Sequence, residues 1–128
     1  MKNFLLLITF FITNITLAQD DNPIHISEVM PQFKGGEEKR VEFLSKKIKY
    51  PKAAKKAKIG GMSYITFVVE KDGSISDVKV LKPNAGCPPC DEEAIRVTKL
   101  MPKWIPGEQD GKKVRVQFNM PLKFTPKQ

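Results

Sequence analysis

The chain is poor in the residues that most enzymes and metal sites use. Its 128 residues include one histidine, two cysteines and one tryptophan. A catalytic triad needs a histidine held beside its nucleophile, and a structural zinc site needs about four ligands. The single histidine, His25, falls in a segment that we expect to be an extended lead-in, and no serine stands in a nucleophile motif. We therefore expect no enzymatic activity, no metal ion and no cofactor.

Long hydrophobic runs are also scarce, and the one present lies near the N-terminus. After the start Met1-Lys2-Asn3, a mostly apolar stretch runs from Phe4 to Ala18. A basic start, an apolar stretch of about 7–15 residues and small residues at its end are typical of a secretory signal peptide, whereas a membrane span needs roughly 20 apolar residues. We predict a signal peptide over residues 1–18, cleaved after Ala18, and a periplasmic or secreted mature chain. An uncleaved anchor in the inner membrane is the alternative.

Acidic residues are outnumbered, with 14 against 22 basic residues and a net charge of +8 at pH 7. One stretch has no acidic residue at all, and its lysines form what we call the lysine patch. The patch consists of Lys46, Lys47, Lys49, Lys52, Lys55, Lys56 and Lys58. Such a patch attracts an anionic surface. We do not expect nucleic acid as a partner, because a secreted chain rarely meets it and the patch lacks a set of base-stacking aromatics. The open alternatives are contact with the anionic cell envelope and a merely solvated helical face.

The remaining chain, about 110 residues, is long enough for one domain. We predict an extended lead-in over residues 19–36 and a domain over residues 37–128. Hydrophobic periodicity and the proline and glycine breaks predict helices over residues 37–49, 51–59 and 91–101, and strands over residues 62–70, 74–81 and 114–124. Asp72-Gly73 supplies a tight turn between the first two strands, and Asp91, Glu92 and Glu93 complement the dipole of the third helix. This α-β-β-α-β order predicts an α+β fold, a two-layer sandwich with a three-stranded antiparallel sheet and helices on one face.

The last predicted strand has the clearest pattern in the chain. Its apolar residues fall at every second position: Val114, Val116, Phe118, Met120, Leu122 and Phe124. Such alternation is typical of a strand with one face on a core and one face in water. Pro121 lies on the polar phase, and a strand that contains proline belongs at a sheet edge or carries a bulge. An exposed edge can accept an extended peptide by strand addition. The alternatives are an edge covered by its own neighbour and an edge that pairs in a homodimer.

Cys87-Pro-Pro-Cys90 is the motif that could support chemistry. A helix N-terminus lowers the pKa of a nearby thiol, as in thiol-disulfide oxidoreductases. The chain lacks the alternating β-α-β pattern of those enzymes, and close cysteines in an oxidising compartment favour a structural disulfide between Cys87 and Cys90. The readings left open are free or partner-linked thiols, a periplasmic thiol-disulfide protein acting through these cysteines, and a metal site, for which two further ligands are missing.

A series of short motifs then resembles the C-terminal domain of TonB, over roughly residues 28–124. Each motif is weak alone, but together they occur in the order of the family. They are Ile48-Lys49-Tyr50-Pro51-Lys52-Ala53-Ala54, Gly60-Gly61, Val68-Val69-Glu70-Lys71-Asp72-Gly73-Ser74-Ile75, Asp91-Glu92-Glu93-Ala94, Met101-Pro102-Lys103-Trp104-Ile105-Pro106-Gly107 and Pro121-Leu122-Lys123-Phe124.

This resemblance implies a periplasmic domain that engages outer-membrane TonB-dependent receptors. In the family, the short N-terminal box peptide of the receptor adds to the last strand, with the tyrosine-proline ridge beside it. The implied partner-binding residues are Tyr50, Pro51, Val114, Arg115, Val116, Gln117, Phe118, Asn119, Met120 and Leu122. A full energy transducer also has a membrane anchor and a long proline-rich spacer. Because the predicted domain follows the signal peptide within a few residues, we expect receptor binding rather than energy transduction by this chain alone.

Overall fold

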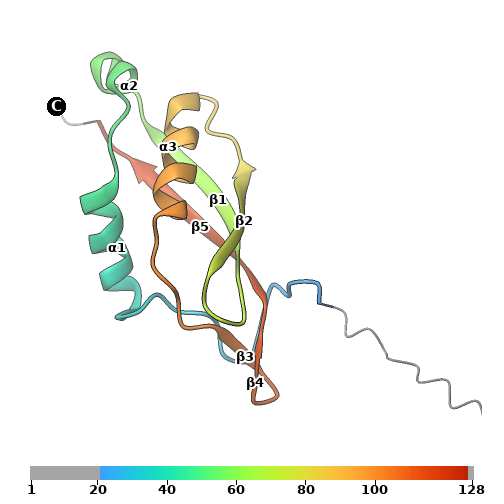
Figure 1. Ribbon diagram of the computed structural model, residues 1–128. Helices are drawn as coiled ribbons and strands as arrows, with labels where there is room; N and C mark the ends of the chain where they lie inside the picture. Colours follow the sequence, from blue (N-terminus) through green and yellow to red (C-terminus); the bar gives the residue numbers. More distant parts are fainter. Residues whose placement is uncertain (1–20, 127–128) are drawn as a thin grey trace, which may run out of the picture.

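The computed structural model describes residues 21–126, so the predicted signal peptide lies outside the described residues. Three helices are present: α1 (Gly36–Lys47), α2 (Lys52–Ala57) and α3 (Pro88–Lys99). A three-stranded antiparallel sheet consists of β1 (Gly61–Val69), β2 (Ile75–Lys82) and β5 (Val116–Phe124), in the order β2-β1-β5 (Figure 1). The predicted α+β fold is confirmed. No helix within residues 21–126 is long and apolar enough to cross a membrane.

The single strand predicted over residues 114–124 is interrupted at Arg115. Val114 ends a separate short strand, β4 (Lys112–Val114), which pairs with β3 (Gly107–Gln109) and places Val114 opposite Gly107. Residues 107–114, for which no hairpin is predicted, therefore form one. Its turn is Asp110-Gly111, where both residues have positive φ, as a two-residue hairpin turn requires.

The helix boundaries also differ from the predicted ones by a few residues. At the end of α1, Ile48 is extended, so this helix ends at Lys47. The next backbone N–H, that of Lys49, donates to the carboxylate of Glu93 at 2.6 Å. α3 begins at Pro88, which suits the first helical position because proline has no N–H to leave unsatisfied there.

The core lies between the sheet and the helices. In β5, the predicted alternation is seen in the burial of Val116, Met120, Leu122 and Phe124, while Asn119, Pro121 and Lys123 are exposed and Phe118 is partly buried. One hydrophobic cluster joins the sheet to all three helices, so the helices cover the same face (Figure 1). Its members include Leu44 from α1, Ala54 from α2, Ile65, Phe67 and Val69 from β1, and Ala94 and Val97 from α3. Burying one such large side chain contributes about 1.5–3 kcal/mol.

An aromatic group occupies the middle of this core. Trp104 is 2% exposed, and its ring lies 5.3 Å from that of Phe67 and 5.1 Å from that of Phe118. Phe33, from the lead-in, meets the same tryptophan edge-on at 5.8 Å. The lead-in thus contributes a buried side chain to the core, where it packs against Trp104.

Candidate functional site

The two edges of the sheet differ in regularity. β5 pairs with β1 without interruption over nine residues, from Phe124 opposite Gly61 to Val116 opposite Val69. The other edge strand, β2, pairs with β1 through two register shifts, and its Asp77 has a φ of 49°. Bulges and lysines are features with which proteins protect sheet edges from pairing. The edge of β5 is therefore the better template for an added strand.

The direction of the backbone groups along β5 follows from one hydrogen bond. The N–H of Gln117 donates away from β1, to the carbonyl of Ile24, at 2.8 Å. Because backbone groups alternate in direction along a strand, Asn119, Pro121 and Lys123 also face outward. Asn119, Pro121 and Lys123 have exposed side chains as well. Pro121 lacks an N–H, so the outer edge offers its carbonyl but not a donor at that position.

The predicted binding residues are accordingly of two kinds. Val116, Met120 and Leu122 have buried side chains, and alternation points their backbone groups toward β1. Phe118 packs in the aromatic core, and Val114 lies in β4. The predicted set mixes these residues with Gln117 and Asn119, whose backbone groups face outward. It leaves out Pro121 and Lys123, whose backbone groups also face outward. The phase of Pro121 was the signal that could have separated the two sets, because proline is tolerated where the N–H faces away from the neighbouring strand.

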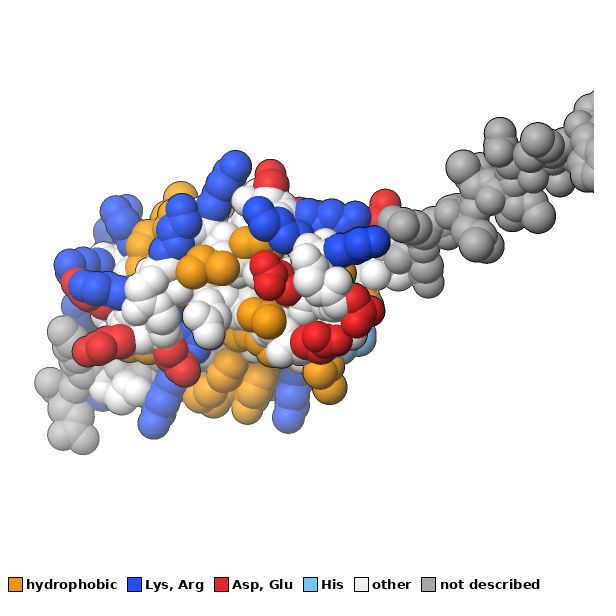
Figure 2. Space-filling model, turned by 90° about the horizontal axis from the view of Figure 1, so that it is seen from below, with side chains coloured by type: hydrophobic (Ala, Val, Ile, Leu, Met, Phe, Trp, Pro, Cys, Tyr) orange, Lys and Arg blue, Asp and Glu red, His pale blue; other side chains and the backbone are white. Residues whose placement is uncertain are grey.

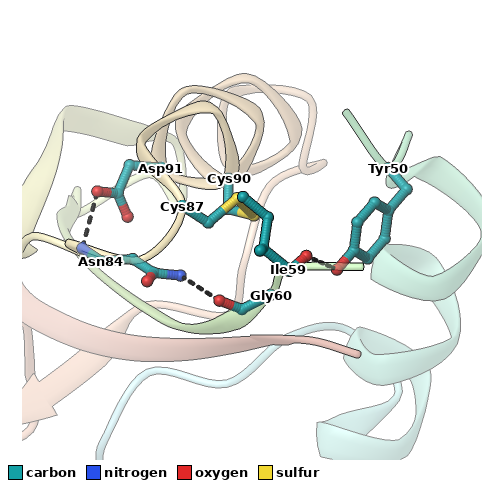
Figure 3. The surroundings of a disulfide bond; sticks show 7 residues. All are labelled: Tyr50, Ile59, Gly60, Asn84, Cys87, Cys90 and Asp91. Carbon is teal, nitrogen blue, oxygen red and sulfur yellow. Dashed lines mark hydrogen bonds between the residues drawn. A yellow bond between two sulfur atoms is a disulfide. The ribbon is translucent and has the colours of Figure 1, made fainter. Parts of the chain in front are cut away.

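Tyr50 lies at the C-terminal end of β5. Its ring meets that of Phe124 edge-on at 5.9 Å, and its hydroxyl donates to the carbonyl of Ile59 (Figure 3). The approach of these segments requires glycine at residue 60, because a Cβ there would stand 2.1 Å from the carbonyl oxygen of Phe124. Pro51 immediately precedes α2. The structure therefore brings the tyrosine-proline pair to the end of the strand that the sequence assigned to binding.

Two side chains of α3 hold the segment that leads to Tyr50. Glu93 accepts from the backbone N–H of Lys49, and Arg96 donates to the carbonyl of Lys47 at 3.0 Å while pairing with Glu93. A carboxylate that binds a specific N–H in this way orders the connection between α1 and α2. The sequence predicts that Glu93 complements the dipole of its own helix, and its contact with Lys49 has no local signal in the sequence.

The lysine patch covers the end of α1, the connection after it and α2. Lys46 pairs with Glu42 at 2.9 Å. Among the described residues, the other lysines of the patch form no ion pair. Of the hollows near it, one of about 250 Å³ is lined by Ser45, Ile48, Tyr50, Lys55 and Thr125. Anionic groups that approach the C-terminal end of β5 would therefore meet a positive surface.

Cys87 and Cys90 form a disulfide at the start of α3, as predicted (Figure 3). Both residues are 0% exposed. Thiol-disulfide exchange needs access of a thiolate to one sulfur, so burial disfavours a redox role. Next to the disulfide, the N–H of Asn84 donates to the carboxylate of Asp91 at 2.9 Å, and its side-chain amide donates to the carbonyl of Gly60. Asn84 thus connects the start of α3 to Gly60, the residue before β1.

Arg115 lies between β4 and β5, where its guanidinium pairs with Glu70. Its Nε donates to the two carboxylate oxygens of Glu70 at 2.9 and 2.8 Å. This hydrogen bond holds the pKa of Glu70 below its usual value. The pair links the residue after β1 to the residue before β5.

A Glu70→Gln substitution should lower stability in a pH-dependent manner. A carboxyl whose pKa is lower in the folded than in the unfolded protein contributes stability above its unfolded pKa, and this contribution disappears as the pH falls through the folded pKa. We expect a loss of about 1 kcal/mol near pH 7, measured by urea denaturation, and a smaller loss at an acidic pH below the unfolded pKa of a glutamate. A loss of equal size at both pH values would show that the pair acts through packing and not through charge.

These features define a small α+β domain whose C-terminal strand presents a regular and largely unpaired edge, a class suited to pairing with an extended segment. The family model described as Gram-negative bacterial TonB protein C-terminal matches residues 46–126. The chain belongs to this family, which confirms the resemblance seen in its motifs.

Solved structures agree with this assignment. Two solution structures of the TonB C-terminal domain of Helicobacter pylori are 28% and 25% identical to the chain, with TM-scores of 0.54 and 0.52; each covers 69% of this chain, and 90% and 78% of the respective domain. The solution structure of the Pseudomonas aeruginosa domain is 25% identical, with a TM-score of 0.50, over 62% of this chain and 79% of that domain. No match was found among curated protein sequences.

Proposed function

We propose that this domain works in the periplasm, where it binds an extended N-terminal segment of an outer-membrane TonB-dependent receptor by strand addition to β5. Membership of the TonB C-terminal family supports receptor interaction as the role. The observation that carries the mechanism is the uninterrupted nine-residue register of β5, in contrast to the shifted register of β2. An added strand needs a neighbour whose outward groups are regularly spaced, and only a regular strand supplies this.

The outward groups limit the strength of binding. Asn119 and Lys123 offer N–H donors on the free part of the edge, Pro121 offers none, and the carbonyls of all three can accept. Each hydrogen bond contributes about 0.5–1.5 kcal/mol net, and association subtracts several kcal/mol. The expected Kd lies in the micromolar to millimolar range, as suits a contact that is released repeatedly.

The experiment is an NMR titration of isotope-labelled residues 19–128 with N-terminal peptides of TonB-dependent receptors. We expect the largest shifts at the outward amides of Asn119 and Lys123, with smaller shifts at the inward amides of Phe118 and Met120. Repeating the titration at higher salt separates strand addition from binding at the lysine patch, because screening weakens the latter. Shifts confined to the lysine patch, or no shifts across a panel of peptides, would contradict the proposal.

A second candidate is contact of the lysine patch with anionic headgroups of the envelope. It is favoured by the absence of acidic residues from this stretch and by the scarcity of ion pairs within it among the described residues. Sedimentation with anionic and neutral vesicles tests it: binding to anionic vesicles alone supports the candidate, and equal binding to both removes it.

A further inference from the structure

The outer edge of β5 already has a partner at its N-terminal end. Ile24 forms a parallel bridge with Val116. The N–H of Ile24 donates to the carbonyl of Arg115 at 3.1 Å, and the N–H of Gln117 donates to the carbonyl of Ile24 at 2.8 Å. One residue that bonds to both neighbours of its partner is the pattern of a parallel strand pair. In residues 21–25, which we call the N-terminal segment, Ile24 thus pairs with the start of β5 as one residue of an added parallel strand would (Figure 1).

Charged side chains hold the beginning of this segment. The guanidinium of Arg115, which also binds Glu70, donates to the carbonyl of Asp21. The amine of Lys71 lies 3.2 Å from the carboxylate of Asp21, and both of these side chains are more than half exposed. Exposed ion pairs add little to stability. The contacts that hold the N-terminal segment thus include the two backbone hydrogen bonds of Ile24 and the hydrogen bond from Arg115 to the carbonyl of Asp21.

The contact with β5 is short because the chain turns away after it. The next bridges of the lead-in join Val29 to Glu108 and Gln32 to Ile105, beside β3. Between them and the segment, Ile26 is 82% exposed, and this end of the molecule shows apolar side chains among basic and acidic ones (Figure 2). Within residues 21–126, the sheet has no further strand beyond β5, so the outward groups from Asn119 to Lys123 stay open.

We propose that the N-terminal segment is an intramolecular competitor for the binding edge. This inference rests on the proposed function and adds a regulatory contact to it. A strand that pairs along the full length of β5 needs the carbonyl of Arg115 and the N–H of Gln117, and Ile24 holds both groups. A tethered segment competes at a high effective concentration although its own contacts are weak. A partner therefore displaces the segment or is restricted to the edge beyond Gln117.

The test uses an Ile24→Pro variant of isotope-labelled residues 19–128. A His25→Pro variant of the same protein is the matched control. Proline at residue 24 removes the N–H that binds Arg115. Proline at residue 25 keeps the N–H and carbonyl of Ile24 and favours the extended conformation of that residue. The probe is a synthetic peptide of residues 21–28 of this chain, added in trans and followed by the amide shifts of Gln117 and Asn119. A peptide with proline in place of Ile24 is the negative control.

We expect the Ile24→Pro protein to bind the peptide at about tenfold lower concentration than the parent and the His25→Pro protein. The Gln117 amide of the free Ile24→Pro protein should also exchange faster with solvent. Equal titration midpoints in the three proteins, or a Gln117 amide that Ile24→Pro leaves unchanged, would overturn the inference. Receptor peptides are titrated into the same three proteins. If the receptor peptides cause no shifts while the peptide of residues 21–28 behaves as expected, the proposed receptor function fails and the inference of an intramolecular competitor stands. If the receptor peptides bind all three proteins equally and shift Gln117, the inference of a competitor fails and the receptor function stands.

Discussion

An Asn119→Pro substitution is expected to weaken receptor-peptide binding at least tenfold and to leave the fold intact. The N–H of Asn119 faces away from β1, in phase with the outward N–H of Gln117, so its removal breaks no hydrogen bond of the sheet. Proline deletes a donor that the added strand needs, and its ring stands in front of the edge. The loss corresponds to about 1–3 kcal/mol of binding free energy. Isothermal calorimetry or NMR titration measures it, and a thermal melt verifies the fold.

Asn119→Ala is the matched control for this substitution. It removes the exposed side chain and keeps the backbone N–H, so binding within about twofold of the parent is expected. Unimpaired binding by the Asn119→Pro protein would show that the partner does not pair with β5. A strongly lowered melting temperature would show instead that this N–H bonds to β1, and the outward set of residues would have to be reassigned.

The parts of the fold that the sequence predicts correctly are those with local causes. The β1–β2 hairpin follows from Asp72-Gly73 between two β-rich runs, and the burial of Phe124 and its alternate neighbours follows from a period of two. The helices follow from apolar faces between proline and glycine breaks. In each case the residues that determine the element are its own, so no knowledge of distant contacts is needed.

The interruption at Arg115 was missed although Asp110-Gly111 is a hairpin signal of the same kind as Asp72-Gly73. Val114 continues the alternation of β5, which hides its pairing with Gly107 in β3. The pairing of Ile24 with Val116 is invisible in the sequence, because a single bridge leaves no periodic pattern. Both features lie where the candidate site begins. The sequence therefore predicts which strand binds, but it does not predict at which residue the unpaired edge of that strand starts.

The candidate site was predicted as a stretch of chain, and the structure divides it by direction. A strand that binds a partner contributes every second residue to it, so Gln117 and Asn119 belong to the edge while Phe118 and Met120 belong to the core and the sheet. Tyr50 is predicted to bind from the family resemblance alone. Its edge-on contact with Phe124 places its ring at the C-terminal end of β5, and its part in binding stays a prediction.

A Gly73→Ala substitution is expected to lower the free energy of unfolding by about 3 kcal/mol, because it combines backbone strain with a clash. Gly73 has a φ of +87°, and a Cβ there would stand 2.0 Å from the carbonyl oxygen of Trp104. The two residues are already joined, because the N–H of Trp104 donates to the carbonyl of Gly73 at 2.8 Å. The methyl group would push back the residue whose ring contacts Phe67 and Phe118 in the core. Urea denaturation followed by tryptophan fluorescence measures the loss.

Gly111→Ala separates the two causes of this loss. Gly111 also has a positive φ, +72°, in a hairpin turn, but a Cβ at this residue would meet no atom within 4 Å, so strain alone remains and about 1 kcal/mol should be lost. Equal losses for the two substitutions would mean that Trp104 yields without cost and that the hairpin is not braced against the core. A larger loss at Gly73, with a changed fluorescence of the native state, would establish that the β1–β2 turn holds Trp104 in place. The tryptophan packs on Phe118 of β5, so the same turn would then support the strand that presents the binding edge.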